Sequence, residues 1–244
     1  MFRTAKELMR RFLYRCGLGK LDVRFRVLKG RNLKHLYLTS LEERFSAIYK
    51  NQVWLCGRPT GSLSGRGSNL ENTLYIRQGL PGILSELGTQ TLLDLGCGDF
   101  GWLKEVELPC KYLGVDIVPH LIQENTALYG SEKRAFEQLD ATRSPLPKAD
   151  TVLCREVLFH LSFQDVWSVI DNLHNSRIGY LIATTDREWK VNADILSGDY
   201  RPINLHQPPW NFPAPLKTIA DNAIDRGRML AVWEVSSLPR SPGR

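Results

Sequence analysis

Glycine and acidic residues follow a short apolar run near the middle of the sequence. Residues 91–95 contain three leucines and are typical of a buried parallel strand. Gly96 and Gly98 come directly after them, and glycine permits both a tight turn and a close approach of the backbone to a ligand. Asp94 adds a carboxylate at the same end of the strand. The segment therefore predicts a ligand-binding turn, followed by a helix that includes Trp102 and its apolar neighbours.

Two kinds of cofactor compete for this turn. Residues 96–101 match the pattern G-x-G-x-x-G, which is typical of dinucleotide-binding proteins, and Asp116 lies twenty residues beyond Gly96. Asp94 argues against a dinucleotide, because its carboxylate would repel a pyrophosphate. The same carboxylate would attract a cationic amino group, such as that of a methionine moiety. We therefore favour a cofactor that carries an amino acid over NAD(P), and a glycine turn without any ligand is the third interpretation.

Two further acids are expected at strand ends beside Asp94. Asp116 closes an expected strand at 112–116, and Asp140 follows another at 135–139. Each acid alone could be a turn residue or a helix cap, but the three are spaced by twenty-two and twenty-four residues, as successive strand–helix units require. Ligands of such sheets bind beyond the carboxyl ends of the strands, so we expect the three carboxylates to meet there. A carboxylate at position 116 can accept hydrogen bonds from both hydroxyls of a ribose.

Strands and helices alternate through the rest of the chain, which is typical of a doubly wound α/β fold. Further strands are expected at 151–154, 179–184, 216–220 and 229–235, and helices at 41–50, 70–87, 121–129 and 163–173. Ser68 or Asn69, together with Glu71, is expected to cap the helix at 70–87. The chain then divides into a basic N-terminal helical extension (1–60), a main domain (61–236) and a disordered tail (237–244).

The string LLDLGCG at residues 92–98 resembles the first motif of class I S-adenosylmethionine-dependent methyltransferases. The resemblance extends in architecture over about residues 68–235 and is most specific in that motif. It implies a Rossmann-like sheet of seven strands, mostly parallel with the last strand antiparallel, and S-adenosylmethionine as the cofactor. It also implies cofactor contacts from a set of residues at the strand ends: Asp94, Gly96, Cys97, Gly98, Asp116, Ile117, Asp140, Ala141, Cys154 and Arg155.

The same resemblance places residues 154–161 beside the methyl group that is transferred. His160 is then the first candidate for a general base, since a neutral imidazole suits a hydroxyl acceptor near neutral pH. Glu156 and His206 are the other candidates. The implied reaction is O-methylation of a small-molecule or glycan-type acceptor. Two alternatives stay open: His160 as a structural residue at a helix start, and the whole chain as a non-catalytic cofactor-binding protein or a membrane-docked scaffold.

Two loops are expected to border the site. Residues 62–73, rich in hydroxyl and amide groups, are interpreted either as a linker with a cap or as a lid over the cofactor. Five prolines between positions 202 and 215 stiffen a second, longer excursion. Its side chains either cover the sheet or form an acceptor wall suited to sugars and other polar small molecules: Tyr200, Arg201, Asn204, His206, Trp210 and Asn211. Residues 208–210 are similar to a box of DNA methyltransferases but follow the wrong strand, which argues against a DNA base as acceptor.

The positive charge of the chain is concentrated at its N-terminus. The net charge is +6, yet residues 1–34 hold eleven Lys or Arg against two acids, so the remaining residues sum to −3. Residues 2–16 have apolar side chains at three- and four-residue steps, which is typical of an amphipathic helix. This helix either packs on its own domain with a solvated basic face or docks on an anionic membrane surface. Nucleic-acid binding is disfavoured, because no recognised motif accompanies the charge.

Composition argues against two other classes of protein. No run of eighteen apolar residues is present, so no transmembrane helix is expected. The five cysteines are scattered and none forms a C-x-x-C pair, so neither a metal site nor a disulfide framework is expected. The expected location is the reducing cytoplasm, either free or peripherally attached to the inner face of the membrane.

Overall fold

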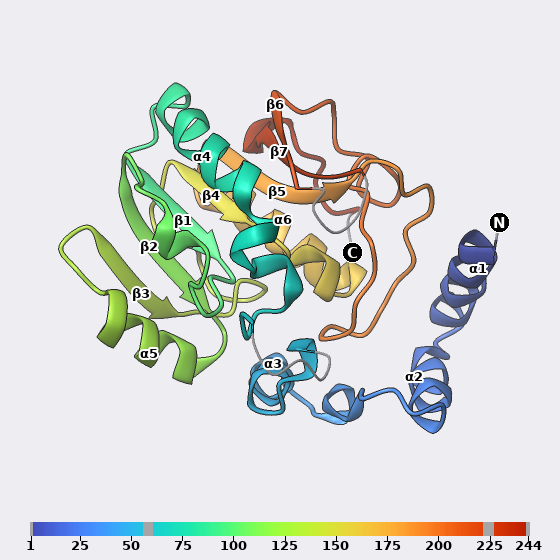
Figure 1. Ribbon diagram of the computed structural model, residues 1–244. Helices are drawn as coiled ribbons and strands as arrows, with labels where there is room; N and C mark the ends of the chain where they lie inside the picture. The colour runs from blue at the N-terminus through green and yellow to red at the C-terminus, as the bar shows by residue number, and fades with distance from the viewer. Residues whose placement is uncertain (1, 56–60, 222–226, 243–244) are drawn as a thin grey trace.

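The computed structural model of the protein describes residues 2–55, 61–221 and 227–242 (Figure 1). Its centre is a seven-stranded sheet in the order β3-β2-β1-β4-β5-β7-β6. The strands are β1 (Thr91–Leu95), β2 (Lys111–Asp116), β3 (Arg134–Gln138), β4 (Thr151–Cys154), β5 (Tyr180–Asp186), β6 (Lys217–Ala220) and β7 (Arg228–Glu234). The first five strands are parallel, and β7 is antiparallel to both of its neighbours. This topology confirms the expected Rossmann-like, mostly parallel sheet with its antiparallel closing strand.

Helices cover both faces of the sheet because alternate residues of each strand point to opposite sides. Leu92 belongs to an apolar cluster with α4 (Leu74–Glu86), and α5 (Pro119–Tyr129) adds Ile122 to that cluster. Leu93 belongs to the cluster on the other face, with α6 (Phe163–Asn175). The order of connection reverses between β1 and its neighbours β2 and β4, so the carboxyl end of β1 lies at the switch point where ligands bind in such folds.

Two local expectations are wrong. The segment after β1 forms only a 3₁₀ turn at Leu103–Glu105 instead of a helix, because Phe100 has a left-handed backbone (φ 54°) and little chain remains before β2. The apolar spacing there reflects burial of Trp102. The helix α4 begins at Leu74, after two 3₁₀ turns, and Thr73 at its N-cap makes no capping bond with its side chain.

The expected capping residues serve other purposes. Asn69 accepts a hydrogen bond from the backbone N–H of Ser62, 3.0 Å away, and so closes the loop before α4. A capping box does occur, but on α3 (Leu41–Lys50), where Ser40 and Glu43 bond reciprocally. The capping box expected at residues 68–71 does not form, and the box on α3 was not predicted.

The N-terminal extension consists of α1 (Phe2–Arg15), α2 (Gly19–Leu28), a 3₁₀ turn at Lys34–Tyr37 and α3. Figure 1 shows α1 and α2 at one end of the molecule, away from the sheet. Both helices are tied to the proline-rich excursion through Asp199, whose buried carboxylate accepts hydrogen bonds from the guanidinium groups of Arg10 and Arg26. His35 donates to the carbonyl oxygen of Gly198 (3.0 Å). The extension is therefore packed against the main domain.

The C-terminal residues that the structure describes also contact the domain. Leu238 is buried in the cluster that includes α6, and the hydroxyl of Ser241 donates to Asp171 (2.8 Å). Residues 243–244 of the expected disordered tail lie outside the described residues. Within the described part of the chain, no helix is long and apolar enough to cross a bilayer. The four cysteines described there, Cys16 among them, are free thiols.

Asp199→Ala should loosen α1 and α2, because it leaves Arg10 and Arg26 without their shared buried carboxylate. Removing one partner of a buried ion pair typically costs about 3–5 kcal/mol. We expect faster tryptic cleavage within residues 11–31, measured by mass spectrometry over time. Asp171→Ala, which removes the bond to Ser241 at the other end of the chain, serves as the matched control. Cleavage at the wild-type rate in Asp199→Ala would contradict the role given to this ion pair.

Candidate functional site

The carboxyl ends of β1, β2 and β4 open into a cavity, here called the strand-end pocket. Nine of the ten residues predicted to contact the cofactor line it: Asp94, Gly96, Cys97, Asp116, Ile117, Asp140, Ala141, Cys154 and Arg155. Gly98 takes part through its backbone, because its N–H donates to Oδ2 of Asp116 (3.0 Å). Parallel strand ends thus bring together residues that are up to sixty positions apart in the sequence.

The glycines allow the turn after β1 to lie closely against its neighbours. Gly96 and Gly98 both have left-handed backbones, with φ of 73° and 58°. A Cβ atom at position 96 would lie 2.5 Å from Cγ2 of Val157, and one at position 98 would lie 2.2 Å from Oγ of Ser64. Any other residue would therefore be strained and would displace these side chains. The turn provides a narrow cradle bordered by backbone amides.

Asp116 is fixed in position by the backbone. Its Oδ1 accepts a hydrogen bond from the N–H of Val118 (3.0 Å), and its Oδ2 accepts the bond from Gly98. Burial raises the pKa of this carboxyl, and the two backbone bonds oppose that effect. Asp140, farther along the same edge, accepts from the hydroxyl of Thr142 (2.6 Å). Both acids keep oxygen lone pairs that a ligand with hydroxyl or amino groups can use.

Asp94 is an acid of the pocket that burial perturbs strongly. Its carboxyl is buried and accepts a hydrogen bond from the hydroxyl of Tyr112 (2.8 Å). Burial raises its pKa to about 7, although the bond from Tyr112 and the charge of Arg155 act in the opposite direction. A cationic group placed against Asp94 would restore the ionised form and gain a strong electrostatic partner.

Aromatic residues of the N-terminal extension form one wall of the pocket. Phe45 and Tyr49 project from α3, and Trp54 follows on a 3₁₀ turn. Sequence reasoning did not assign them to the site, since nothing local indicates which helix face meets a pocket formed by distant strands. The sequence did contain one signal: Phe45 and Tyr49 are four residues apart, which places them on one face of a helix, and Trp54 follows them.

The loop before α4 closes over the glycine turn. The hydroxyls of Ser62 and Ser64 donate to the carboxylate of Asp99 at 2.6 and 3.1 Å, and the N–H of Asp99 donates back to Ser64 (3.0 Å). Ser64 and Ser68 line the strand-end pocket. This geometry favours the interpretation of the loop as a lid, and residues 56–60 nearby lie outside the described part of the chain.

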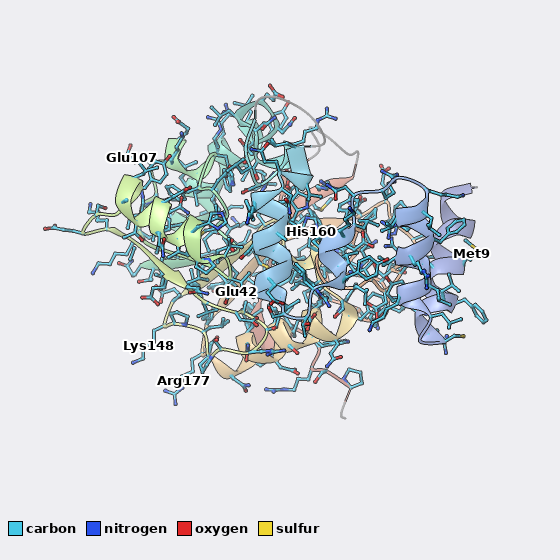
Figure 2. All side chains as sticks on the ribbon, turned by 90° about the horizontal axis from the view of Figure 1, so that it is seen from below. Met9, Glu42, Glu107, Lys148, His160 and Arg177 are labelled. Atoms are coloured by element: carbon cyan, nitrogen blue, oxygen red, sulfur yellow. The ribbon has the colours of Figure 1, made fainter. Side chains whose placement is uncertain are left out.

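His160 lies at the centre of the molecule, on the pocket wall (Figure 2). Its ring stacks on Trp54, with centroids 4.7 Å apart and planes 27° apart. Its Nδ1 lies 2.8 Å from the carbonyl oxygen of Asp199. A carbonyl can only accept, so Nδ1 carries the proton and Nε2 keeps the lone pair. Burial lowers the pKa of His160 to about 4, so the ring is neutral at physiological pH.

Glu156 is held between arginines beside His160. Its carboxylate accepts a hydrogen bond from Nη1 of Arg228 (3.1 Å) and lies 3.7 Å from Nη2 of Arg155. A Cβ atom on Gly67 would lie 1.9 Å from Oε2 of Glu156, so the lid backbone touches this carboxylate. Arg155 in turn donates to the carbonyl oxygen of Gly67 (2.8 Å). Because these contacts hold its carboxylate in place, Glu156 is better suited to orient neighbouring groups by its charge than to act as a mobile base.

The side chains expected to form an acceptor wall on the proline-rich excursion do not line the strand-end pocket. The structure does not bring His206 to the strand-end pocket, since its ring packs against Trp233 (5.8 Å) and its Nδ1 donates to the carbonyl oxygen of Phe212. Arg201 and Trp210 are buried and pack on each other. Among the residues that the structure describes, none of the six expected wall residues lines the pocket. The alternative, a structural cover over the sheet, describes this excursion better.

Comparison with known proteins identifies the fold around this pocket. Residues 93–176 match the family model of a methyltransferase domain. These residues form a methyltransferase domain, set in a sheet with the class I topology. The match covers β1 to α6 and therefore contains the glycine turn, the three strand-end acids and His160.

Two solved methyltransferases share the fold. Human N-acetylserotonin methyltransferase in complex with S-adenosylmethionine is 13% identical, with 95% of this chain and 69% of that chain covered and a TM-score of 0.52. Magnesium protoporphyrin IX methyltransferase from Synechocystis PCC 6803, with bound S-adenosylmethionine, is 15% identical, with 80% and 94% covered and a TM-score of 0.50. At these identities the likeness concerns the fold alone. The sequence has no match among curated proteins.

The pocket of the methyltransferase domain fits S-adenosylmethionine, the cofactor of this class. The glycine turn gives the backbone cradle, the fixed carboxylate of Asp116 suits the ribose hydroxyls, and Asp140 suits the adenine amino group. The buried carboxyl of Asp94, beside the glycine turn, suits the cationic amino group of the methionine part. The described residues contain no cluster of three or more metal-ligating side chains. The backbone amides and carboxylates of the pocket therefore agree with the cofactor expected from the sequence.

Asp94→Asn should weaken S-adenosylmethionine binding and stabilise the ligand-free protein. The folded pKa of Asp94, about 7, exceeds its ordinary value of 3.8, so the wild-type fold loses stability as pH rises between these values. Asparagine does not ionise, so it avoids this loss of stability, and its side-chain oxygen can still accept the hydrogen bond from Tyr112. We expect a higher melting temperature for Asp94→Asn, with a larger gain at pH 8 than at pH 5, and at least a tenfold loss of affinity by calorimetry.

The matched control is Asp150→Asn, because Asp150 bonds to the backbone of Thr91 at the opposite end of β1. This variant should keep wild-type affinity. In the wild type, affinity should fall as the pH drops below about 7, since Asp94 becomes protonated. Affinity that is equal in Asp94→Asn and wild type at pH 8 would contradict the assignment of Asp94 to the amino group.

Proposed function

We propose that this protein is an O-methyltransferase that acts on a hydroxyl group of a small polar or glycan-type acceptor, with His160 as the general base. One observation carries the proposal. The bond from Nδ1 of His160 to the carbonyl oxygen of Asp199 fixes the tautomer, so a neutral ring on the pocket wall keeps its lone pair on Nε2. A hydroxyl acceptor needs such a group, because its proton must leave as the new bond to carbon forms.

Some residues of the pocket bind the cofactor, and another takes up the proton of the acceptor. When bound, S-adenosylmethionine supplies a methyl group on a positively charged sulfur, which keeps the electron pair of the broken bond. Asp94 and Asp116 hold the cofactor, and the glycine turn orients it. His160 takes up the hydroxyl proton at Nε2 while the acceptor oxygen bonds to the methyl carbon. Alignment of this kind can lower a barrier by roughly 7–11 kcal/mol.

The side chains near His160 support this class of acceptor. Trp54 and Tyr49 add aromatic rings to the pocket lining, and Glu156 and Ser68 add polar groups to it. Aromatic faces combined with hydrogen-bonding groups suit a polar ring such as a sugar. The two methyltransferases of similar fold are named for different acceptors, so the proposal rests on the pocket of this chain.

A transfer assay tests the reaction. The protein is incubated with S-adenosylmethionine that carries a labelled methyl group and with panels of alcohols, sugars, carboxylic acids and amines. We expect label in the alcohol or sugar panel, recovered as a methyl ether. Transfer to amines alone would overturn the proposed O-methylation and leave the methyltransferase domain itself unquestioned.

His160→Ala should lower kcat by about 10²–10⁴-fold, the usual contribution of a positioned base. Cofactor affinity should stay within a few-fold of wild type, because no cofactor contact is assigned to His160. His206→Ala is the matched control, since His206 also donates from Nδ1 to a backbone carbonyl but lies outside the pocket. Wild-type turnover in His160→Ala would remove this residue from the reaction, and a collapse of cofactor binding would make it structural.

A further inference from the structure

The N-terminal helices α1 and α2 expose apolar side chains that nothing in the described chain covers. Phe12 is 65% exposed, Phe25 56% and Leu28 80%. These residues belong to what we call the outer face of the two helices, whose exposed apolar members are Leu8, Met9, Phe12, Leu21, Phe25 and Leu28. Large exposed apolar side chains that gather on one face are typical of an interaction site.

The ion pairs at Asp199 explain why this face points outward. Arg10 on α1 and Arg26 on α2 both reach the Asp199 carboxylate, so they define the inner side of each helix. Phe12 and Leu28 are each two residues away from one of these arginines, which places them on nearly the opposite side of a helix with 3.6 residues per turn. Figure 2 shows Met9 at the outer edge of the molecule, far from His160.

The charge of the outer face has a single sign. Six exposed cations lie on or beside the two helices: Arg11, Arg15, Lys20, Arg24, Lys29 and Arg31. Arg11 and Arg15 also border a pocket that Asp194 of the main domain lines. None of the six forms an ion pair within the described chain. Asp22, the only acid among residues 8–34, is directed inward to Arg10 and Arg26 and so does not lie among these cations.

We propose that the outer face docks on the anionic surface of a lipid bilayer. Apolar side chains at this density enter the boundary between headgroups and acyl chains, while the surrounding cations meet lipid phosphates. Lys29 shows the combination directly, because its Nζ lies 4.3 Å from the centre of the Phe25 ring. Docking in this way holds the protein at the inner face of the membrane, independently of which acceptor is methylated.

Two other occupants fit the outer face less well. A second copy of the chain would bring two positively charged faces together, and the like charges would repel. A nucleic acid would satisfy the cations, but it would leave several aliphatic side chains against phosphates and water. An anionic bilayer is the partner that satisfies both the charge and the apolar area.

Sedimentation of the full-length protein with lipid vesicles tests the proposal. We expect binding to vesicles of equal parts phosphatidylcholine and phosphatidylglycerol, little binding to phosphatidylcholine alone, and weaker binding as salt rises. Phe12→Ser combined with Phe25→Ser, and separately Arg15→Glu combined with Arg24→Glu, should each reduce binding at least tenfold. All four side chains are exposed, so the fold should be kept, and circular dichroism checks this.

The matched control combines Leu128→Ser with Lys148→Glu, since both residues are exposed elsewhere on the surface. It should bind vesicles as the wild type does. Equal binding to both kinds of vesicle, or mixed-vesicle binding that the outer-face variants do not change, would overturn the proposal. So would two other results: a dimer in sedimentation equilibrium that the serine variants abolish, or binding of an oligonucleotide in preference to vesicles.

Discussion

The arrangement of this molecule depends on the ion pairs and the hydrogen bond that Asp199 makes. Its side chain receives Arg10 and Arg26 from the N-terminal helices, and its backbone carbonyl receives the Nδ1 proton of His160. A carboxylate taken out of water costs several kcal/mol unless it is paired and hydrogen bonded. Burial would raise the pKa of Asp199, yet the two arginines hold it below its usual value. One residue therefore joins the extension, the excursion and the pocket.

The strand-end part of the pocket could be predicted from the sequence because its signals are local and its assembly follows from topology. Gly96 and Gly98 are required by a turn with positive φ, and Asp94 stands beside them in the same short string. Parallel strands end at the same edge, so Asp116 and Asp140 could be placed there without knowing any distance. His160 followed from its position after β4.

The other wall could not be predicted, because it depends on contacts between distant segments. Trp54 stacks on His160, and the extension that carries Trp54 packs on residues 196–201; no local sequence pattern indicates this packing. The proline-rich excursion could not be interpreted correctly for the same reason, because its role also depends on contacts between distant segments. Arg201 and Trp210 are residue types that often bind ligands, yet here they fill the interior, and only the tertiary structure distinguishes the two uses.

The contact between Gly67 and Glu156 has a consequence for how this sequence can vary. The lid backbone approaches the carboxylate so closely that a methyl group at position 67 has no space. Glu156 in turn is fixed by its bond to Arg228 and cannot turn aside freely. The two positions are therefore coupled: a side chain at 67 requires Glu156 to leave its bond to Arg228 or to be replaced by a shorter residue. Diversification of this pocket, natural or in a library, has to treat positions 67 and 156 together.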